Sequence, residues 1–422
     1  MTADPGWLTG RVVCSLLVCL AIPAAGRAQD PGIPASDGPE HLSEAARVSL
    51  VTVFPGEEVY SLFGHNAIRV VDPPQGIDVA YNYGTFSFGN PVAFAARFAY
   101  GDLNYRLDRQ SFGRMAAYYP VAEGRPIVEQ VLDLDPEAKE EIYRFLEWNA
   151  LPENAYYRYD FYFDNCATRI RDVLERTLGD RLIPEEVDPH ATLRQLLDPY
   201  LAERSWLHFA MDTGQGIPAD APATWRSALF LPDRLATWAA GSRVAGPDGP
   251  RPLVASTDSI GWADSPTLPT GGLDWPALVM TALLVLVVGW TALDLRTGDT
   301  RRGAAWLDVP LLSALGFAGL LIGFLWFVAL HAVTKNNLNL LWALPTNLVL
   351  VAVYGRQRGR PWKIALLAAT AVCAFVFAVG WPVWPQELPL ATLPLAVAVA
   401  VRMSGLVLLE RRARAREGTA RG

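Results

Sequence analysis

The sequence predicts two folds in one chain: a mixed α+β domain, followed by an all-α transmembrane bundle of about five helices. Of its 422 residues, 51% are hydrophobic and only 19% are charged, against about 25% charged in a typical soluble domain. The apolar surplus is concentrated after about residue 275. Before that point, β-branched runs and helix-like stretches are mixed, as in an α+β domain.

The same composition excludes several classes of protein. Intrinsic disorder requires few apolar residues, and a nucleic-acid binder requires a basic face, whereas this chain has a net charge of -7. Four cysteines are too few for a disulfide scaffold. The sequence contains no metal-ligand spacing, phosphate-binding glycine loop, nucleotide motif or internal repeat. We therefore expect no cofactor and no nucleic-acid partner.

Residues 1–28 are predicted to be a secretory signal peptide. Arg11 precedes a short apolar run over 12–25, and small residues follow as far as Ala28. The run is short for a membrane span, although an uncleaved N-terminal anchor is the alternative. Residues 29–44 are rich in Pro, Gly, Asp and Ser and are predicted to be a linker.

Residues 45–240 are predicted to form the mixed domain, and 241–274, rich in Pro, Gly and Ser, a tether. One helix opens at Asp135, which is followed by a proline suited to the first helical position. Asn165 caps another helix, which runs over 166–178 and is stopped by a glycine. Strands are expected at 47–54, 66–71, 79–83, 103–107, 127–134 and 157–163, and further helices at 189–203 and 224–240.

Residues 275–410 are predicted to form the membrane domain, because they contain five apolar stretches, each near the roughly 20 residues of a spanning helix. Arginine-rich loops at 294–305 and 355–363 and a basic tail at 411–422 alternate with loops of little positive charge. Positive loops stay in the cytoplasm, so the C-terminus is expected inside and the segment 29–274 outside. The five stretches are 276–293, 307–330, 338–354, 364–381 and 388–409.

Cys166 is the residue that most strongly indicates chemistry. Once a signal peptide is removed, it is the only cysteine outside the membrane, because Cys373 lies in the fourth predicted span. It is expected at a helix start, where free amide groups and the helix dipole stabilise a thiolate. It shares a helix face with Ile170 and Val173, so the thiol is expected to face the strands. The alternative is an inert buried cysteine that packs as a small hydrophobe.

A thiol nucleophile needs a base close by, and His65 is the candidate. His41 lies in the predicted linker, and His190 and His208 are expected on the surface. His65 instead stands between a glycine and a predicted strand. A histidine at a strand start that faces a cysteine at a helix start can form a catalytic dyad. A hydrogen-bonded core histidine is the alternative.

Five short motifs surround these residues: GHNAIRV at 64–70, YNYG at 81–84, GDLNY at 101–105, DNCATR at 164–169 and TKNNLNLLW at 334–342. As a set, they resemble motifs of the Lnb-type bacterial lipoprotein N-acyltransferases, and the resemblance extends over most of residues 45–410. The soluble domain is also similar to circularly permuted papain-like folds, in which histidine precedes cysteine in the sequence.

The resemblance implies a thiol acyltransferase that attaches a third acyl chain to lipoproteins in the bacterial inner membrane. It implies Cys166 as nucleophile and His65 as base. A membrane phospholipid would donate the acyl chain, and the α-amino group of a diacylated lipoprotein would accept it from a thioester. The soluble domain would lie in the periplasm. Asn82 is our candidate for orienting His65, with an ordinary turn or ladder asparagine as the alternative.

Five polar residues are predicted to contact the substrates. Asn165 directly precedes the nucleophile. The other four cluster at the outer end of the predicted bundle, where they would bind a phosphate headgroup or the incoming amine: Lys335, Asn336, Asn337 and Asn339. An ordinary outer loop is the alternative for this cluster.

Two other functions stay open on the sequence alone. One is a membrane-tethered Cys/His hydrolase of peptide, peptidoglycan or lipid ester bonds. The other is a non-catalytic anchored binding module. A dyad does not separate a transferase from a hydrolase, because the acceptor is chosen by the shape of the pocket and by the exclusion of water.

Overall fold

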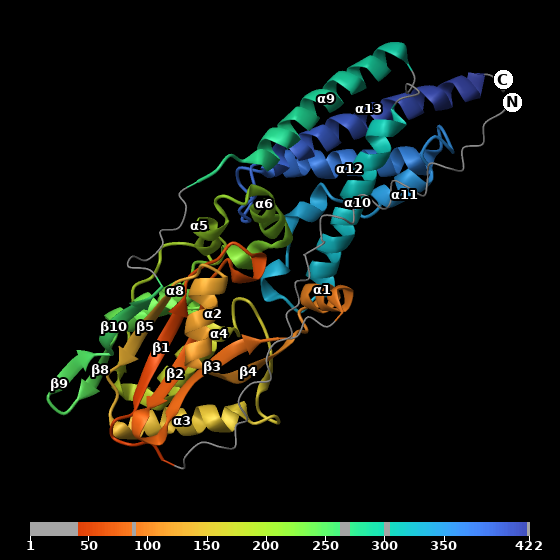
Figure 1. The fold of residues 1–422 in the computed structure, drawn as a ribbon. Helices are drawn as coiled ribbons and strands as arrows, with labels where there is room; N and C mark the ends of the chain where they lie inside the picture. Colours follow the sequence, from red (N-terminus) through yellow and green to blue (C-terminus); the bar gives the residue numbers. More distant parts are fainter. Residues whose placement is uncertain (1–40, 87–89, 262–270, 299–303, 420–422) are drawn as a thin grey trace.

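The computed structural model describes residues 41–419 except 87–89, 262–270 and 299–303. The predicted signal peptide and nearly all of the predicted linker lie outside these residues. Figure 1 shows a sheet-containing body at one end of an elongated molecule and a bundle of long helices at the other. The α+β domain followed by a helical membrane domain, as the sequence predicts, is confirmed.

A seven-stranded sheet forms the centre of the soluble domain, with the strand order β10-β5-β1-β2-β3-β4-β6. All neighbouring strands are antiparallel. The central strand β1 is buried at every position but its first, because helices cover both faces of the sheet. The strands are β1 (Arg47–Val53), β2 (His65–Asp72), β3 (Ile77–Thr85), β4 (Asn104–Ser111), β5 (Ile127–Leu132), β6 (Tyr156–Arg158) and β10 (Val254–Ile260).

Consecutive residues of β2 contribute to two different cores, because side chains alternate across a strand. Ile68 and Val70 pack with α3 (Pro136–Ala150) and α4 (Cys166–Leu178) on one face. Ala67 packs with α2 (Phe112–Ala122) on the other. The sheet is therefore the middle layer of three.

Local sequence chemistry accounts for the well-predicted elements. The Asp135 carboxylate accepts a hydrogen bond from the amide of Ala138 at the start of α3, as expected of an N-cap. The predicted strand at 157–163 is mostly wrong. Only Tyr156–Arg158 is a strand, and the chain then turns at Asp160, whose carboxylate accepts hydrogen bonds from the amides of residues 162 and 163. The predicted helix at 224–240 divides at Pro232 into α7 (Trp225–Ala228) and α8 (Pro232–Gly241).

The first part of the predicted tether at 241–274 is folded as strands over 243–260, which corrects its boundary. Strand β10 pairs with β5 and extends the main sheet, so the soluble domain continues to Ile260. A small second sheet contains β7 (Leu182–Ile183), β8 (Arg243–Gly246) and β9 (Gly249–Pro252). Strand β10 is an edge strand with mostly exposed residues, so it is held by backbone pairing and has no apolar pattern to reveal it.

Four of the described helices are long and apolar enough to cross a membrane: α9 (Trp275–Thr297), α10 (Ala305–Phe327), α12 (Pro361–Gly380) and α13 (Thr392–Thr419). The sequence predicts a fifth continuous helix at 338–354. That stretch is broken into a single turn, η9 (Leu338–Leu341), and the short helix α11 (Asn347–Ala352). Pro345 lies in the break, where it has no amide hydrogen to give to a helix.

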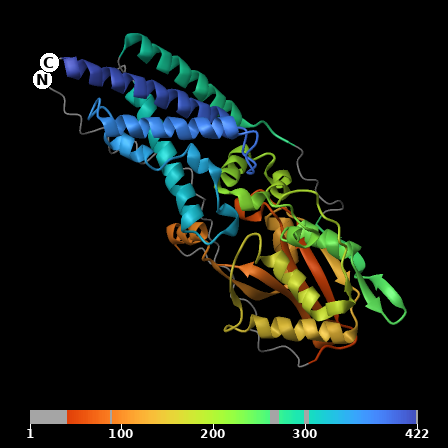
Figure 2. The ribbon, with the colours of Figure 1, turned by 180° about the vertical axis from the view of Figure 1, so that it is seen from behind.

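A buried ion cluster joins three helices of the bundle. Arg402 of α13 is fully buried, and its guanidinium donates to Asp294 of α9 at 2.9 Å and to Asp308 of α10 at 2.6 Å. The Tyr354 hydroxyl donates to the Asp308 carboxylate at 2.6 Å. Figures 1 and 2 both show α13 between α9 and α12. Because a charge in a membrane needs partners, this cluster holds the three helices in one arrangement.

The soluble domain and the bundle are fastened together at the end of the sheet where β1 ends and β2 begins. Leu62, just before β2, shares a core with Val333, which follows α10. The amide of Gly216 donates to the Val333 carbonyl at 2.8 Å. The amide of Leu330, beyond the end of α10, donates to the carbonyl of Tyr100 at the end of α1 (Pro91–Tyr100) at 2.7 Å. This end of the sheet therefore faces the bundle (Figure 1).

Candidate active site

Cys166 is the first residue of α4, and its position is set by the cap before it. The Asn165 side-chain oxygen accepts from the amide of Thr168 at 3.0 Å, and the Thr168 hydroxyl accepts from the amide of Asn165 at 2.8 Å. This reciprocal capping box fixes where the helix begins. It thereby holds the thiol at the end of the helix that carries unpaired amide groups.

His65 is the first residue of β2 and follows Gly64, whose φ of +77° is in the left-handed region. Its Nε2 is hydrogen bonded to the side-chain oxygen of Asn82 on β3. Because an amide oxygen only accepts, Nε2 carries the ring proton and the lone pair lies on Nδ1. The neutral imidazole is therefore in the tautomer that can take a proton at Nδ1.

Gly84 marks the point where the predicted histidine and cysteine come together. A Cβ placed on Gly84 would lie 3.7 Å from His65 Cε1, 3.9 Å from Tyr157 Oη and 4.0 Å from Cys166 Cβ. Ile68 pairs with Tyr81, so continuing the antiparallel register sets Gly84 opposite His65. The position of Gly84 is therefore in van der Waals contact with the imidazole ring, the Cys166 side chain and the Tyr157 hydroxyl, and the absent side chain leaves room there for one small group.

Burial keeps both members of this pair uncharged. It raises the pKa of the Cys166 thiol to about 11, although the backbone amides of Asn66, Ala167 and Cys166 itself favour the thiolate. It lowers the pKa of His65 to about 4, against the hydrogen bond that the ring donates to Asn82, which favours the charged ring. At neutral pH the pair is a thiol and an imidazole. The helix start was expected to stabilise a thiolate, and here burial outweighs it.

Tyr157 and Gly84 are site residues that the sequence analysis missed. Tyr157 is buried, and its hydroxyl has no hydrogen-bond partner among the described residues. The guanidinium of Arg169 lies over its ring, 3.7 Å from the centroid. Gly84 belongs to the YNYG motif and Tyr157 to the strand predicted at 157–163, but neither was expected to take part in the site. The Tyr157 hydroxyl is free to donate to a group that enters the space beside Gly84.

The structure gives Asn165 a folding role in place of the predicted substrate contact. Its side-chain nitrogen donates to the carbonyls of Phe161 and Phe230, both at 2.8 Å. Its oxygen is used by the cap. Both amide hydrogens are thus engaged inside the protein, and none is left for a substrate.

Two of the predicted outer-loop ligands are internal as well. Asn337 and Asn339 are fully buried, and both side-chain nitrogens donate to the carbonyl of Thr213, at 2.8 and 3.2 Å. The Asn339 oxygen accepts from the indole of Trp342 at 2.9 Å, and the Asn337 oxygen accepts from Gln386 at 3.2 Å. These two asparagines fasten the soluble domain to the bundle and are closed to a headgroup.

The other two members of that cluster differ from each other. Lys335 donates through Nζ to the carbonyls of Leu325 and Ala329, so it caps the end of α10. Asn336 is exposed, with a φ of +52°. Of the four, only Asn336 presents its side chain mainly to solvent.

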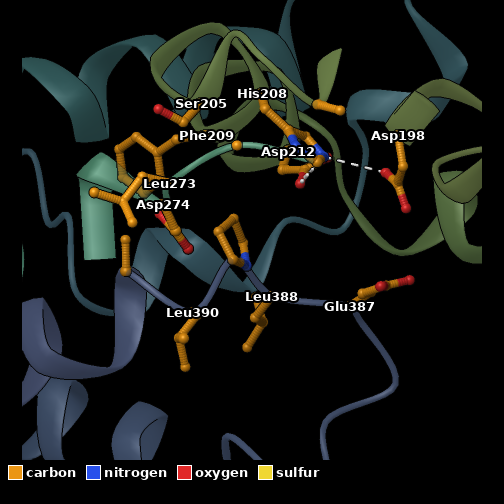
Figure 3. Close-up of a pocket in the computed structure, with 14 residues that line it drawn as sticks. Asp198, Ser205, His208, Phe209, Asp212, Leu273, Asp274, Glu387, Leu388 and Leu390 are labelled. Atoms are coloured by element: carbon orange, nitrogen blue, oxygen red, sulfur yellow. Dashed lines mark hydrogen bonds and ion pairs between the residues drawn. The ribbon is translucent and has the colours of Figure 1, made fainter. Parts of the chain in front are cut away.

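A cavity of about 270 Å³ lies where the soluble domain meets the bundle, away from the predicted site residues. Figure 3 shows His208 of α6 (Ser205–Gly214) turned toward Asp198 and Asp212, at 3.1 and 3.2 Å. The hydrogen bond to Asp198 raises the pKa of His208, and burial raises the pKa of Asp212 to about 6. Asp274 and Glu387 add further acidic groups. Within the described residues, no group of three or more His, Cys, Asp or Glu is placed to hold a metal ion.

Two family models match the chain. One, described as the Lnb N-terminal periplasmic domain, matches residues 41–199. The other, described as the Lnb transmembrane domain, matches residues 271–414. Comparisons with curated proteins and with solved structures find no match. The two matched ranges correspond to the two parts of the structure, and the resemblance predicted from the sequence motifs is confirmed.

Proposed function

Because the chain belongs to the Lnb family of membrane-anchored, lipoprotein-modifying enzymes, we propose that it is a lipoprotein N-acyltransferase with Cys166 as its nucleophile. The observation that carries this proposal is the closeness of His65 and Cys166, whose ring Cε1 and Cβ lie 3.7 and 4.0 Å from the position that a Cβ on Gly84 would occupy. Asn82, hydrogen bonded to His65, completes a Cys-His-Asn set of the kind that other thiol enzymes use for acyl transfer.

In the first half-reaction, the Cys166 sulfur attacks an ester carbonyl of a membrane phospholipid. His65 takes the thiol proton at Nδ1 as the new C–S bond forms. The tetrahedral intermediate carries a negative oxygen, which the amides of Asn66 and Cys166 would stabilise, since both are close enough to the sulfur to lower its pKa. Collapse breaks the ester C–O bond, His65 returns the proton to the leaving alkoxide, and lysophospholipid departs from an acyl thioester.

In the second half-reaction, the α-amino group of a diacylglyceryl-cysteine attacks the thioester. His65 takes a proton from the attacking nitrogen, the C–S bond breaks, and the proton returns to the sulfur. The product is an amide, and the enzyme is restored with a neutral thiol and imidazole. A neutral pair suits this cycle, because His65 must begin each half-reaction as a base.

The membrane bundle explains how such a site would meet its substrates. Both the donor and the acceptor are held in a lipid bilayer, and the sheet end with His65 faces the bundle. Fixing the dyad at the bilayer replaces a search through solution by an encounter at a surface. We propose the inner membrane as its location, with the soluble domain in the periplasm and the C-terminus in the cytoplasm.

The test is expression in cells that lack their own N-acyltransferase, followed by mass spectrometry of lipoprotein N-termini. We expect triacylated peptides with the wild-type chain and only diacylated peptides with Cys166→Ala at equal expression. Diacylated peptides from well-expressed wild-type protein would reject the transferase. Free fatty acid and lysophospholipid without N-acylation would instead indicate a hydrolase.

The covalent intermediate gives a second, independent measurement. Intact-mass analysis of wild-type protein incubated with phospholipid vesicles should show a fatty acyl adduct on the Cys166 peptide that hydroxylamine removes. His65→Ala should reduce the adduct by about 100-fold or more, in line with the usual contribution of a general base. An adduct that forms at the wild-type rate without His65 would contradict its assignment as the base.

A further inference from the structure

Helix α1 exposes an apolar face that no other part of the described chain covers. Val92 and Phe98 are 78% and 51% exposed, and Tyr100 is exposed as well. Most of the residues between them are exposed alanines, and the helix contains no acidic residue. Water is a poor surrounding for such a face, because contiguous exposed apolar surface normally marks a contact site.

The place of α1 identifies what covers this face. Its C-terminal end is joined to the outer end of the spanning helix α10: the carbonyl of Phe98 accepts from the imidazole of His331 at 2.8 Å, and Tyr100 lies 6.5 Å from Phe324 of α10 between ring centroids. Figures 1 and 2 both show α1 beside that end of α10. Phe327 and Val328, at the same end of α10, are also exposed apolar residues.

The charge on α1 is also suited to a lipid surface. Arg97 is exposed in the last turn, and among the described residues it takes part in no ion pair. A cation beside an apolar face can meet lipid phosphates while the apolar side chains enter the acyl region. We propose that α1 is an interfacial helix that lies in the outer surface of the bilayer, beside the spanning bundle.

This helix is tied directly to the thiol site. It connects β3, which carries Asn82 and Gly84, to β4, which carries Tyr105. A row of stacked rings runs from α1 into the domain: Phe94 to Phe86 at 5.4 Å, Phe86 to Tyr105 at 4.8 Å and Tyr105 to Tyr159 at 4.2 Å. Burial raises the pKa of Tyr105, and the nearby Cys166 raises it further. The depth of α1 in the bilayer thus sets the height of the dyad above the lipid.

Photocrosslinking in vesicles tests the proposal without reference to activity. The full chain, with p-benzoylphenylalanine at Phe98, is reconstituted in phosphatidylethanolamine–phosphatidylglycerol vesicles and irradiated. We expect lipid adducts at Phe98, as at Phe317 on the exposed flank of α10. Trp148 is equally exposed but lies on α3, at the edge of the domain far from the bundle, and should give none. Adducts at Phe98 no more frequent than at Trp148, or adducts with protein, would overturn the proposal.

The rate of acyl-enzyme formation, a measurement that rests on the proposed function, tests whether α1 helps the enzyme to use phospholipid in a bilayer. The double variant Val92→Glu/Ala96→Glu places two charges on the exposed face. It should form acyl-enzyme about 10-fold more slowly from vesicle phospholipid and within about two-fold of wild type from short-chain, monomeric phospholipid. Trp148→Glu is the matched control and should change neither rate. Equal loss with both donors would overturn the interfacial role, whereas absence of acyl-enzyme in wild type would refute the proposed function and leave the crosslinking result standing.

Discussion

Two polar clusters in this molecule differ in how their side-chain hydrogen bonds are used. The thiol site, made of His65, Asn82, Cys166 and Tyr157, has an unpaired phenol and an imidazole with a free lone pair. The joint between soluble domain and bundle uses the side chains of Asn337, Asn339 and Gln386 on internal partners, and accepts at the Thr213 carbonyl, although the Thr213 hydroxyl has no partner among the described residues. Side chains with unused hydrogen-bonding groups beside a reactive thiol indicate a catalytic site. Side chains whose hydrogen bonds are made inside the protein indicate a structural role.

The largest expected effect comes from closing the space at the thiol site. Gly84→Ala would place a methyl group 3.7 Å from His65 Cε1 and 4.0 Å from Cys166 Cβ, at a residue with a φ of +99°. We expect acyl-enzyme formation to fall by about 100-fold or more, because the methyl group occupies room beside the reacting side chains and the positive φ strains the strand that positions them. The rate of the Cys166 adduct, measured by intact mass, checks this.

Gly76→Ala is the matched control for the backbone strain. Gly76 has a φ of +69°, and a Cβ there would meet no atom within 4 Å. It should lose about 1–2 kcal/mol of stability, as L-residues do in this conformation, and keep its activity. If Gly76→Ala and Gly84→Ala lose the same activity, the loss is caused by backbone strain, and the space beside Gly84 is not needed for catalysis.

A pair of asparagine variants compares the two clusters directly. Asn82→Ala should lower acyl-enzyme formation about 10- to 100-fold with little change in melting temperature, since it frees the imidazole to rotate. Asn339→Ala should instead lower stability by about 1–3 kcal/mol, because it leaves the Trp342 indole unpaired, while activity per folded molecule stays within about two-fold.

Asn82→Asp distinguishes positioning from simple packing. A carboxylate keeps the hydrogen bond to His65 and also raises the pKa of the imidazole, so part of the activity should return and the acid limb of its pH profile should move upward. If Asn82→Asp regains activity while the acid limb of its pH profile stays at the wild-type pH, residue 82 does not contact His65.

The smallest expected effect is that of pH on the wild-type thiol site. His65 loses its function as a base only when it is protonated, which for a pKa of about 4 happens as the pH falls through 4. The Cys166 thiol ionises only near pH 11. Acyl-enzyme formation should therefore vary less than about two-fold between pH 6 and 9. A steep rise near pH 6.5 would show that the imidazole has its ordinary pKa and that burial does not control it.

Sequence reasoning was most successful where a local rule decides the structure. The cap at Asn165 and the helix start at Cys166 follow from neighbouring residues, and the structure has them at those positions. It misread the outer polar cluster, because Asn337 and Asn339 are satisfied by Thr213, more than a hundred residues away. Strand β10 and helix α1 were missed for a related reason. Strand β10 is held by pairing with a neighbouring strand, and α1 is proposed to contact lipid, and neither partner can be inferred from the residues of the element itself.

The ion cluster around Arg402 has a consequence for biogenesis. Its guanidinium comes from the last helix of the chain, whereas Asp294 and Asp308 belong to the first two helices of the bundle. During synthesis, the two acidic side chains are made about a hundred residues before the cation that neutralises them. The early helices are therefore made before the cation that neutralises their carboxylates, and α13 enters the lipid at low cost only by docking onto them. A chain truncated before Arg402 would leave both carboxylates without the cation that neutralises them, which makes completion of the polypeptide a checkpoint for its own assembly.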